Sequence, residues 1–215
     1  MKKLLLLMPL LLLGALLSAC STGASPAAGG VNCTYTATGT AAKQVALPPG
    51  SHVPNTGTVP YTIQLNSDRV TVNLDQAHTP CTVNSFISLA KQGYFDQTSC
   101  HRLVDGGLFV LQCGDPTGTG SGGPGYKFAD ELSGKETYPA GTLAMANAGP
   151  GTNGSQFFIV YADSQLPPNY TVFGHVDAAG IKVVAAIGAG GQDGSYPDGS
   201  GKPNLPAQIK GVVAG

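Results

Sequence analysis

Residues 141–164, GTLAMANAGPGTNGSQFFIVYADS, carry the strongest structural signal in the chain. Two short apolar runs, at 142–146 and 156–161, flank a segment of Gly, Asn and Pro that favours turns. A second segment, YFDQTSCHRLVDGGLFVLQCGD at 94–115, is built in the same way, with runs at 101–104 and 108–112. Short apolar runs separated by turn residues predict β-strands at all of these positions.

The sequence around these segments predicts further strands. Residues 61–65 and 70–74 alternate apolar and polar positions, which is the pattern of a β-hairpin. Two more runs, at 171–176 and 207–213, are also expected to be strands. Together with two helices, these strands favour a mostly β fold. We expect a closed eight-stranded antiparallel barrel capped by two α-helices, because closure removes exposed strand edges.

The two helices have local start and stop signals. Thr79 is expected to cap the first helix and Pro80 to occupy its first position, while Gly93 ends it. An apolar stripe on this helix predicts a face that packs on the core. The second helix is expected at 181–187, a run that is apolar enough to pack on one end of a barrel.

Several motifs occur together in a combination that suggests a family. They resemble the signature regions of cyclophilins, and the resemblance runs from about Val59 to Val213. It implies a cyclophilin-like fold and peptidyl-prolyl cis-trans isomerase activity on proline-containing peptides, with no metal and no other cofactor. The segments that carry it are residues 94–115, Met145–Pro150 (MANAGP), Asn153–Phe158 (NGSQFF) and Leu166–Gly174 (LPPNYTVFG).

The chemistry of this reaction indicates what the site needs. Rotation about an X-Pro amide crosses a barrier of roughly 18–20 kcal/mol and breaks no covalent bond, so it requires neither a nucleophile nor a metal. In the twisted state the proline nitrogen regains a lone pair. A hydrogen-bond donor aimed at that nitrogen stabilises the transition state more than the ground state. Arg102 is the candidate donor because its charged guanidinium presents a planar fork of N–H groups.

The resemblance supplies the other site residues. Gln112 and Gln156 are expected to orient Arg102 and contact the substrate backbone, and Asn147 to bind substrate through its own backbone beside Ala146. His101 should face away from Arg102 along the strand, which favours a supporting role. The proline pocket is expected to contain Phe109, Val110, Phe158 and Leu166, with Tyr170 at its edge. The catalytic set is thus Arg102, Gln112, Phe109 and Asn147; the substrate-binding set is His101, Val110, Ala146, Gln156, Phe158, Leu166 and Tyr170.

Two other classes of function compete with an enzyme. A binding module or chaperone with little turnover would use the same proline groove, but it would have no need of the donor Arg102. A structural envelope lipoprotein would leave the joint pattern of site residues unexplained. Residues 118–123 match G-x-G-x-x-G, but Pro124–Gly125 follows in place of a helix, so a loop is expected and not a dinucleotide site.

The first residues predict export and a lipid anchor. Lys2 and Lys3 precede an apolar run, Leu4–Leu17, of about fourteen residues, which is short for a membrane span of roughly twenty and suits a signal peptide. The run ends in Leu17-Ser18-Ala19-Cys20, which resembles a bacterial lipobox with Cys20 as the lipidated residue. An ordinary secretory signal is the alternative. The expected organisation is a signal peptide at 1–19, the lipidated Cys and an extension at 20–57, and an isomerase domain at 58–215.

The cysteines after Cys20 and the net charge of the chain indicate in which compartment the protein works and which partners it can bind. The cysteines after Cys20 are Cys33, Cys81, Cys100 and Cys113, an even number that favours two disulfides in an exported protein. Three pairings are possible; Cys100–Cys113 across a hairpin, with Cys33–Cys81, is favoured, and the lack of CxxC spacing argues against zinc. A net charge of −1 and a pI near 6.4 provide no basic surface for nucleic acid. We expect an extracytoplasmic, membrane-anchored monomer that acts on unfolded exported proteins. Residues 31–57 are either a tether or an extra strand held down by Cys33.

Overall fold

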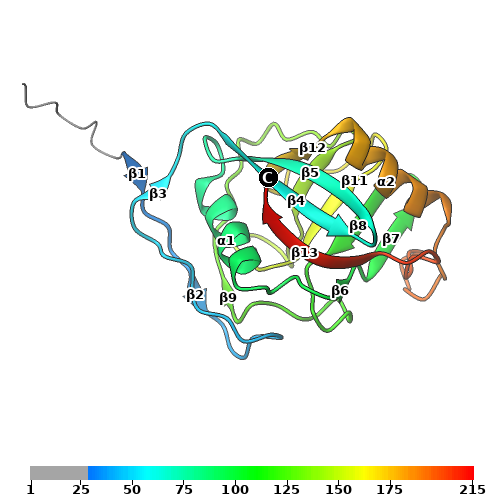
Figure 1. Cartoon of the computed structure of the whole chain (residues 1–215), viewed down its shortest axis with the longest axis horizontal. Coiled ribbons are helices and arrows are strands. Elements are labelled where there is room, and N and C mark those ends of the chain that lie inside the picture. The colour runs from blue at the N-terminus through cyan, green and yellow to red at the C-terminus, as the bar shows by residue number, and fades with distance from the viewer. Residues whose placement is uncertain (1–28) are drawn as a thin grey trace, which may run out of the picture.

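The computed structural model describes residues 29–215 and is dominated by one nine-stranded antiparallel sheet (Figure 1). The strand order in this sheet is β6-β13-β4-β5-β12-β10-β11-β8-β7. Its strands are β4 (Thr58–Leu65), β5 (Asp68–Asp75), β6 (Thr98–Ser99), β7 (Arg102–Asp105), β8 (Phe109–Cys113), β10 (Thr142–Met145), β11 (Phe157–Val160), β12 (Val172–Val176) and β13 (Gln208–Ala214). Four two-residue strands lie outside it: β1 (Gly30–Val31), β2 (Thr36–Ala37), β3 (Val53–Pro54) and β9 (Tyr126–Lys127).

The expected closed eight-stranded barrel is wrong, because the sheet is a nine-stranded half-barrel that begins at β6 and ends at β7. The chain itself joins these two edges. The N–H of Cys100 donates to Ala207 beside β13, whereas the N–H of the next residue, His101, donates to Gln112 in β8. The backbone therefore changes partner strand at this corner, and β6 has only two residues before it does so. Gly201 forms a bridge with Leu103 and covers the outer edge of β7, which limits the exposed edge that closure would have removed.

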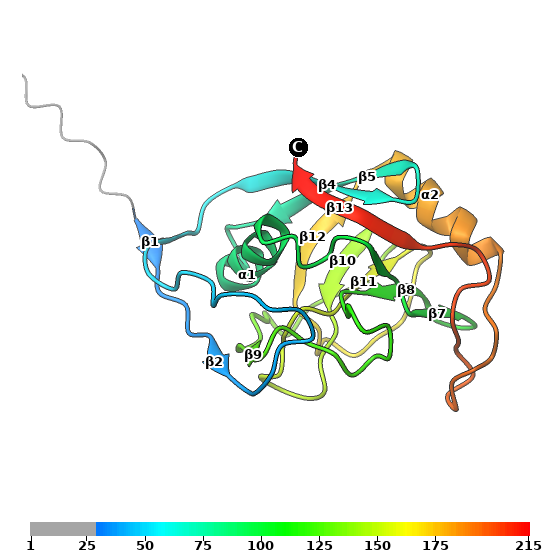
Figure 2. The same ribbon diagram turned by 60° about the horizontal axis from the view of Figure 1, so that its bottom comes forward.

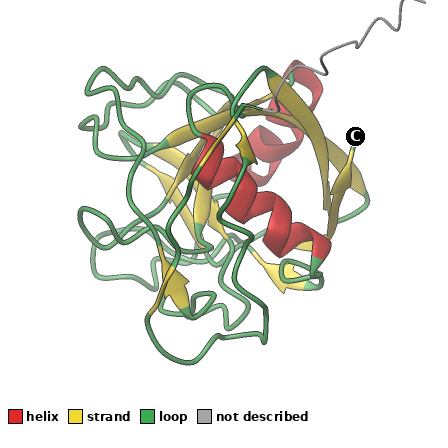
Figure 3. Cartoon of the chain, turned by 90° about the vertical axis from the view of Figure 1, so that its left-hand side faces the viewer, coloured by secondary structure: helices red, strands yellow, loops and turns green. Residues whose placement is uncertain are grey.

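Two helices cover the ends of the sheet, α1 (Pro80–Lys91) and α2 (Ala178–Ala189), and much of the remaining chain is loop (Figure 3). Pro80 occupies the first turn of α1 as expected, but the Thr79 hydroxyl donates to the carbonyl of Asp75 and does not cap the helix. Glu131 caps it from a distant loop, accepting from the N–H groups of residues 81 and 82 at 3.0 and 2.8 Å. Helix α2 begins three residues earlier than expected, because the carboxylate of Asp177 accepts from Gly180 at 2.7 Å.

The apolar side chains form two separate clusters. The larger fills the space between the sheet and α1, where the ring centroid of Phe86 lies 5.1–5.5 Å from those of Phe95, Phe157 and Phe173. The smaller cluster lies on the other face of β10 and β11, with Phe158 at its centre. Neighbouring strand residues point to opposite faces, so Phe157 belongs to the core and Phe158 to the second cluster.

The extension before β4 is folded onto the domain. Strand β1 pairs with β3, and β2 pairs with β9, so the extension runs along one side of the body (Figure 2). Disulfides join Cys33 to Cys81 and Cys100 to Cys113, the pairing that the sequence favoured. Of the two interpretations of residues 31–57, an extra strand held by Cys33 is therefore the one observed.

The predictions of export and lipid attachment concern the first residues of the chain. Cys20 and the apolar run before it lie outside the described residues. Among residues 29–215, neither helix has the length and apolar character needed to cross a bilayer. In the same range, no three His, Cys, Asp or Glu side chains gather closely enough to hold a metal ion.

Replacing both Cys33 and Cys81 by Ser should lower the free energy of unfolding by about 3–4 kcal/mol, because the bond closes a 48-residue loop in the unfolded chain. Denaturant unfolding would measure this change, and hydrogen exchange in residues 29–57 should become faster. Thr34→Ala, an exposed substitution next to Cys33, is the matched control. A loss below about 1 kcal/mol, the typical effect of an ordinary substitution, would contradict the constraint.

Candidate functional site

Arg102 lies in β7 directly opposite Gln112 in β8, and three acceptors hold its guanidinium. Its Nη1 donates to Gln112 Oε1 at 3.1 Å, its Nε to Ser200 Oγ at 2.8 Å, and its Nη2 to Asp198 Oδ2 at 2.7 Å. A guanidinium has five N–H groups, so these bonds fix its plane and leave two donors for a ligand. The Arg102 side chain is 27% exposed, which leaves it accessible to a ligand.

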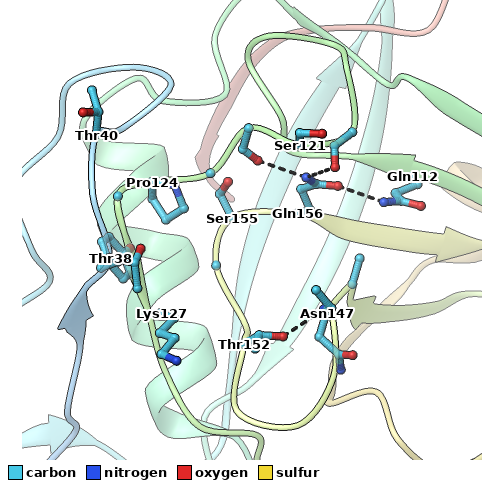
Figure 4. A pocket seen from close by; sticks show the side chains of 18 residues that line it. Thr38, Thr40, Gln112, Ser121, Pro124, Lys127, Asn147, Thr152, Ser155 and Gln156 are labelled. Carbon is cyan, nitrogen blue, oxygen red and sulfur yellow. Dashed lines mark hydrogen bonds between the residues drawn. The ribbon is translucent and has the colours of Figure 1, made fainter.

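A chain of side-chain amides continues from Arg102. The Nε2 of Gln112 donates to Gln156 Oε1 at 2.8 Å. Gln156 Nε2 in turn donates to the carbonyls of Gly120 and Gly122, both at 2.9 Å (Figure 4). Each amide therefore has a fixed orientation. Hydrogen bonds thus link the position of Arg102 to that of the glycine-rich loop, residues 118–123.

The glycine-rich loop is wrapped around the buried carboxylate of Asp115. This carboxylate accepts from the backbone N–H groups of Thr117, Gly120 and Gly122 at 2.8, 2.8 and 3.0 Å, and from the Thr117 hydroxyl at 2.7 Å. Burial alone would raise the pKa of Asp115, but these hydrogen bonds outweigh it and lower the pKa. Gly122 is needed here, since a Cβ would lie 2.0 Å from an Asp115 oxygen. The segment at 118–123 is thus a loop, as its sequence predicted.

An apolar cluster lies on the same face of the sheet as Arg102. The strand registers align Arg102 with Gln112, Gln112 with Phe158, and Phe158 with Ala144, so these side chains point to the same face. The Phe158 ring meets that of Tyr170 edge-on at 5.6 Å. Val110, Ala146 and Leu166 belong to the same cluster, which brings together most of the residues expected to form the proline pocket.

Asn147 presents free main-chain groups beside this cluster. Its side chain is engaged elsewhere: Nδ2 donates to the carbonyl of Asn169 at 2.9 Å, and Oδ1 accepts from Gly149 at 3.2 Å. Within the described chain, no hydrogen bond uses the backbone N–H or C=O of Asn147. Ala146, by contrast, donates its N–H to Gln156. The backbone of Asn147 is therefore available to an extended peptide.

Two of the sequence-predicted residues lie apart from this arrangement. The Phe109 ring meets that of Tyr161 edge-on, with centroids 5.8 Å apart, and does not belong to the cluster around Phe158. His101 is buried beneath the glycine-rich loop, 3% exposed, and neither of its ring nitrogens has a partner among residues 29–215. Burial lowers the pKa of His101, with the charge of Arg102 acting in the same direction and Asp115 opposing it.

Three residues of the site were not predicted from the sequence. Asp198 and Ser200 lie in a turn-rich segment, where such residues ordinarily indicate only a turn. The bond from Ser200, and to a lesser degree Arg102, lowers the pKa of Asp198 to about 2. Tyr138, in an irregular segment, is buried behind Phe158, and its hydroxyl bonds both backbone groups of Tyr170 at 3.1 Å. No local pattern in the sequence marks any of the three.

Most of the chain is similar to known proteins of one family. Residues 61–213 match the family model "Cyclophilin type peptidyl-prolyl cis-trans isomerase/CLD". The "Probable peptidyl-prolyl cis-trans isomerase B" of Mycobacterium leprae is 49% identical over 79% of this chain and 63% of its own length. The "Peptidyl-prolyl cis-trans isomerase A" of Mycobacterium tuberculosis is 40% identical over 73% of this chain and 92% of its own length.

A solved structure shows the same fold. It is a cyclophilin-type peptidyl-prolyl cis-trans isomerase of Cryptosporidium parvum, determined in the presence of the dipeptide Ala-Pro, with a TM-score of 0.64 and 33% identity. The match covers 73% of this chain and 98% of that one. The chain spans only 63–64% of the length of the mycobacterial B-type relatives. The family match, which covers most of the chain, shows that this protein belongs to the cyclophilin-type peptidyl-prolyl cis-trans isomerases.

Proposed function

We propose that this protein catalyses cis-trans isomerisation of X-Pro bonds. The observation that carries the proposal is the Arg102 guanidinium, which three acceptors fix while two of its N–H groups have no partner among residues 29–215, beside the apolar cluster around Phe158. The Ala-Pro dipeptide in the Cryptosporidium crystal supports a proline-containing ligand for this kind of groove.

In the proposed mechanism the proline ring packs against Phe158 in the pocket, and its nitrogen faces Arg102. Adjacent strands lie about 4.8 Å apart, so the backbones of β7 and β11, separated by β8, are about 10 Å apart. This span accommodates a proline ring and the end of a long arginine side chain. As the amide twists, the nitrogen gains electron density and its bond from Arg102 strengthens, which lowers the barrier.

Two further residues act on the substrate backbone in this mechanism. Asn147 offers its free main-chain N–H and C=O to the peptide, which holds one side of the rotating bond. Gln112 lies between Arg102 and Gln156 and can also bond the substrate carbonyl. Asp198 and Ser200 are positioning residues, since they touch Arg102 and act on the substrate only through it.

A binding module that only holds proline segments is the second candidate function. The apolar cluster around Phe158 and the free backbone of Asn147 would serve it equally well. Three bonds that restrict Arg102 favour the enzyme, because a binder gains little from a donor fixed beside the proline nitrogen. Isomerisation is therefore the function that the site supports best.

We also propose that the protein is an exported lipoprotein that assists the folding of other exported proteins. Two disulfides in a domain of this size suit an oxidising compartment outside the cytoplasm. The basic start, the apolar run and Cys20 supply the export signal and the lipid attachment site. The extension after Cys20 then connects the membrane to the folded domain. The protein acts as a monomer.

Arg102→Ala should lower kcat/KM for an Ala-Pro peptide by about a hundredfold or more, the cost of removing one preorganised donor from a transition state. Arg102→Lys should recover little, because an ammonium lacks the planar fork. Exchange NMR of the peptide measures both. Retention of wild-type rates by a folded Arg102→Ala protein would contradict the proposed mechanism.

The rate should be independent of pH between 7 and 9. The pKa of His101 lies below its usual value of 6.5, so its ring is neutral throughout this range, and Asp198, with a pKa of about 2, is fully charged. A pH profile of kcat/KM on an uncharged Ala-Pro peptide tests this expectation. An inflection between pH 7 and 8 would show that a titrating group, such as a protonated His101, takes part in the reaction.

Cys20→Ser should abolish lipid attachment and release the protein from membranes, because the thiol of Cys20 is the proposed attachment point. Labelling the full chain with radioactive palmitate in a bacterial host, followed by membrane fractionation, measures both effects. Cys33→Ser is the matched control, since it removes a cysteine already joined in a disulfide. An unlabelled wild-type protein would contradict the lipoprotein proposal.

A further inference from the structure

A polar pocket of about 580 Å³ adjoins the candidate active site. It shares Gln112, Ala146, Asn147 and Gln156 with the candidate active site. A peptide whose proline lies against Phe158 must therefore pass this pocket with a neighbouring residue. The volume is in the range of ligand sites and is large enough for one or two side chains.

The extension supplies the far wall of this pocket. Thr38 and Thr40 lie across the hollow from Gln112 and Gln156 (Figure 4). Both threonines fall outside residues 61–213, the part of the chain that matches the family model. This wall is thus an addition of the extension to the family domain.

The extension forms backbone hydrogen bonds with Gly123, the last residue of the glycine-rich loop, and with Gly125 just after it. The N–H of Thr38 donates to the carbonyl of Gly125 and that of Ala42 to Gly123, both at 2.9 Å. Gly125 has a φ of +77°, and a Cβ there would lie 2.9 Å from the carbonyl oxygen of Gly39. Glycine is therefore required for the two segments to approach so closely.

The other end of the extension is fixed to helix α1. The Cys33–Cys81 disulfide lies just before the wall, and the Tyr35 hydroxyl donates to the carbonyl of Cys81 at 2.7 Å. Asn84 donates in turn to the Tyr35 hydroxyl at 2.9 Å. With anchors on both sides, Thr38 and Thr40 have a fixed position relative to the groove, as a specificity element requires.

The residues that line the pocket favour a polar or acidic side chain in the ligand. Among the described residues that line the pocket, Lys127 alone has a charged side chain, and it is exposed. Across residues 29–215, no carboxylate lies within salt-bridge distance of its ammonium. The threonines and Ser121 add hydroxyls that can both donate and accept. A lysine or arginine in the ligand would meet Lys127 and be disfavoured.

We propose that the extension is part of the substrate-binding site: Thr38 and Thr40 of the extension, together with Lys127 of the domain, receive an acidic or neutral hydrogen-bonding side chain close to the target proline. The inference rests on the proposed isomerase function, because it assumes that a peptide occupies the adjoining groove. The hydroxyls of Thr38 and Thr40 are the part of this site that lies outside residues 61–213.

Two peptide series built around Ala-Pro test the proposal with the full chain. One series carries Glu, Gln or Lys two positions before the alanine, and the other carries the same residues two positions after the proline. Exchange NMR gives the dissociation constant and the isomerisation rate for each peptide. The wild type should favour Glu over Lys about two- to fivefold in one series, the size expected of one solvent-screened ion pair.

Lys127→Glu should reverse this preference, whereas Lys182→Glu, the same charge change on exposed α2, should leave it as it is. Replacing Thr38 and Thr40 together by Val should weaken binding of the Glu and Gln peptides about two- to tenfold, through loss of the hydroxyl bonds. Thr34→Val, in the same extension but outside the pocket, is the matched control.

The outcomes separate the two claims. Equal binding of the Glu, Gln and Lys peptides in both series, or equal effects of Lys127→Glu and Lys182→Glu, would contradict the proposal that this pocket binds and selects a ligand side chain. If the paired valine variant bound like Thr34→Val, the extension would have no part in substrate binding. The expected binding preferences without any acceleration of exchange would support the pocket and contradict the isomerase function instead.

Discussion

The restriction of Arg102 is the constraint on which the rest of the site depends. A flexible arginine would have to be ordered in every catalytic event, at a cost in side-chain entropy. Here the guanidinium is ordered in advance by acceptors from two distant parts of the chain, Gln112 in the neighbouring strand and the turn that contains Asp198 and Ser200. Preorganised donors of this kind are the usual main source of catalytic stabilisation.

The fold delivers this arrangement through strand register. Because β7, β8 and β11 are neighbours in the sheet, Arg102, Gln112 and Phe158 share one row on one face. A slip of one residue in β8 would turn Gln112 into the core and break the row. The corner at Cys100 and the disulfide to Cys113 lie at the ends of these strands, where they help to fix the register.

Local patterns in the sequence were sufficient to predict the main helices and strands, but not whether the sheet closes into a barrel. Alternation at 61–74 and the Thr79-Pro80 pair located the hairpin and α1, because these signals act over a few residues. The half-barrel depends on a change of partner strand at Cys100, which no local pattern records. Asp198, Tyr138 and the cap from Glu131 were missed for the same reason, since each acts on residues more than thirty positions away. The signature motifs, by contrast, located Arg102, Gln112, Gln156 and Phe158 together.

The most direct test of the account is a double-mutant cycle between Asp198 and Arg102, with kcat/KM for an Ala-Pro peptide measured in all four proteins. Asp198→Ala should lower kcat/KM about three- to tenfold in the wild-type background, because the guanidinium loses one of its fixed acceptors. In the Arg102→Ala background the same substitution should have no further effect. Equal losses in the two backgrounds would show that Asp198 acts independently of Arg102 and would contradict the account.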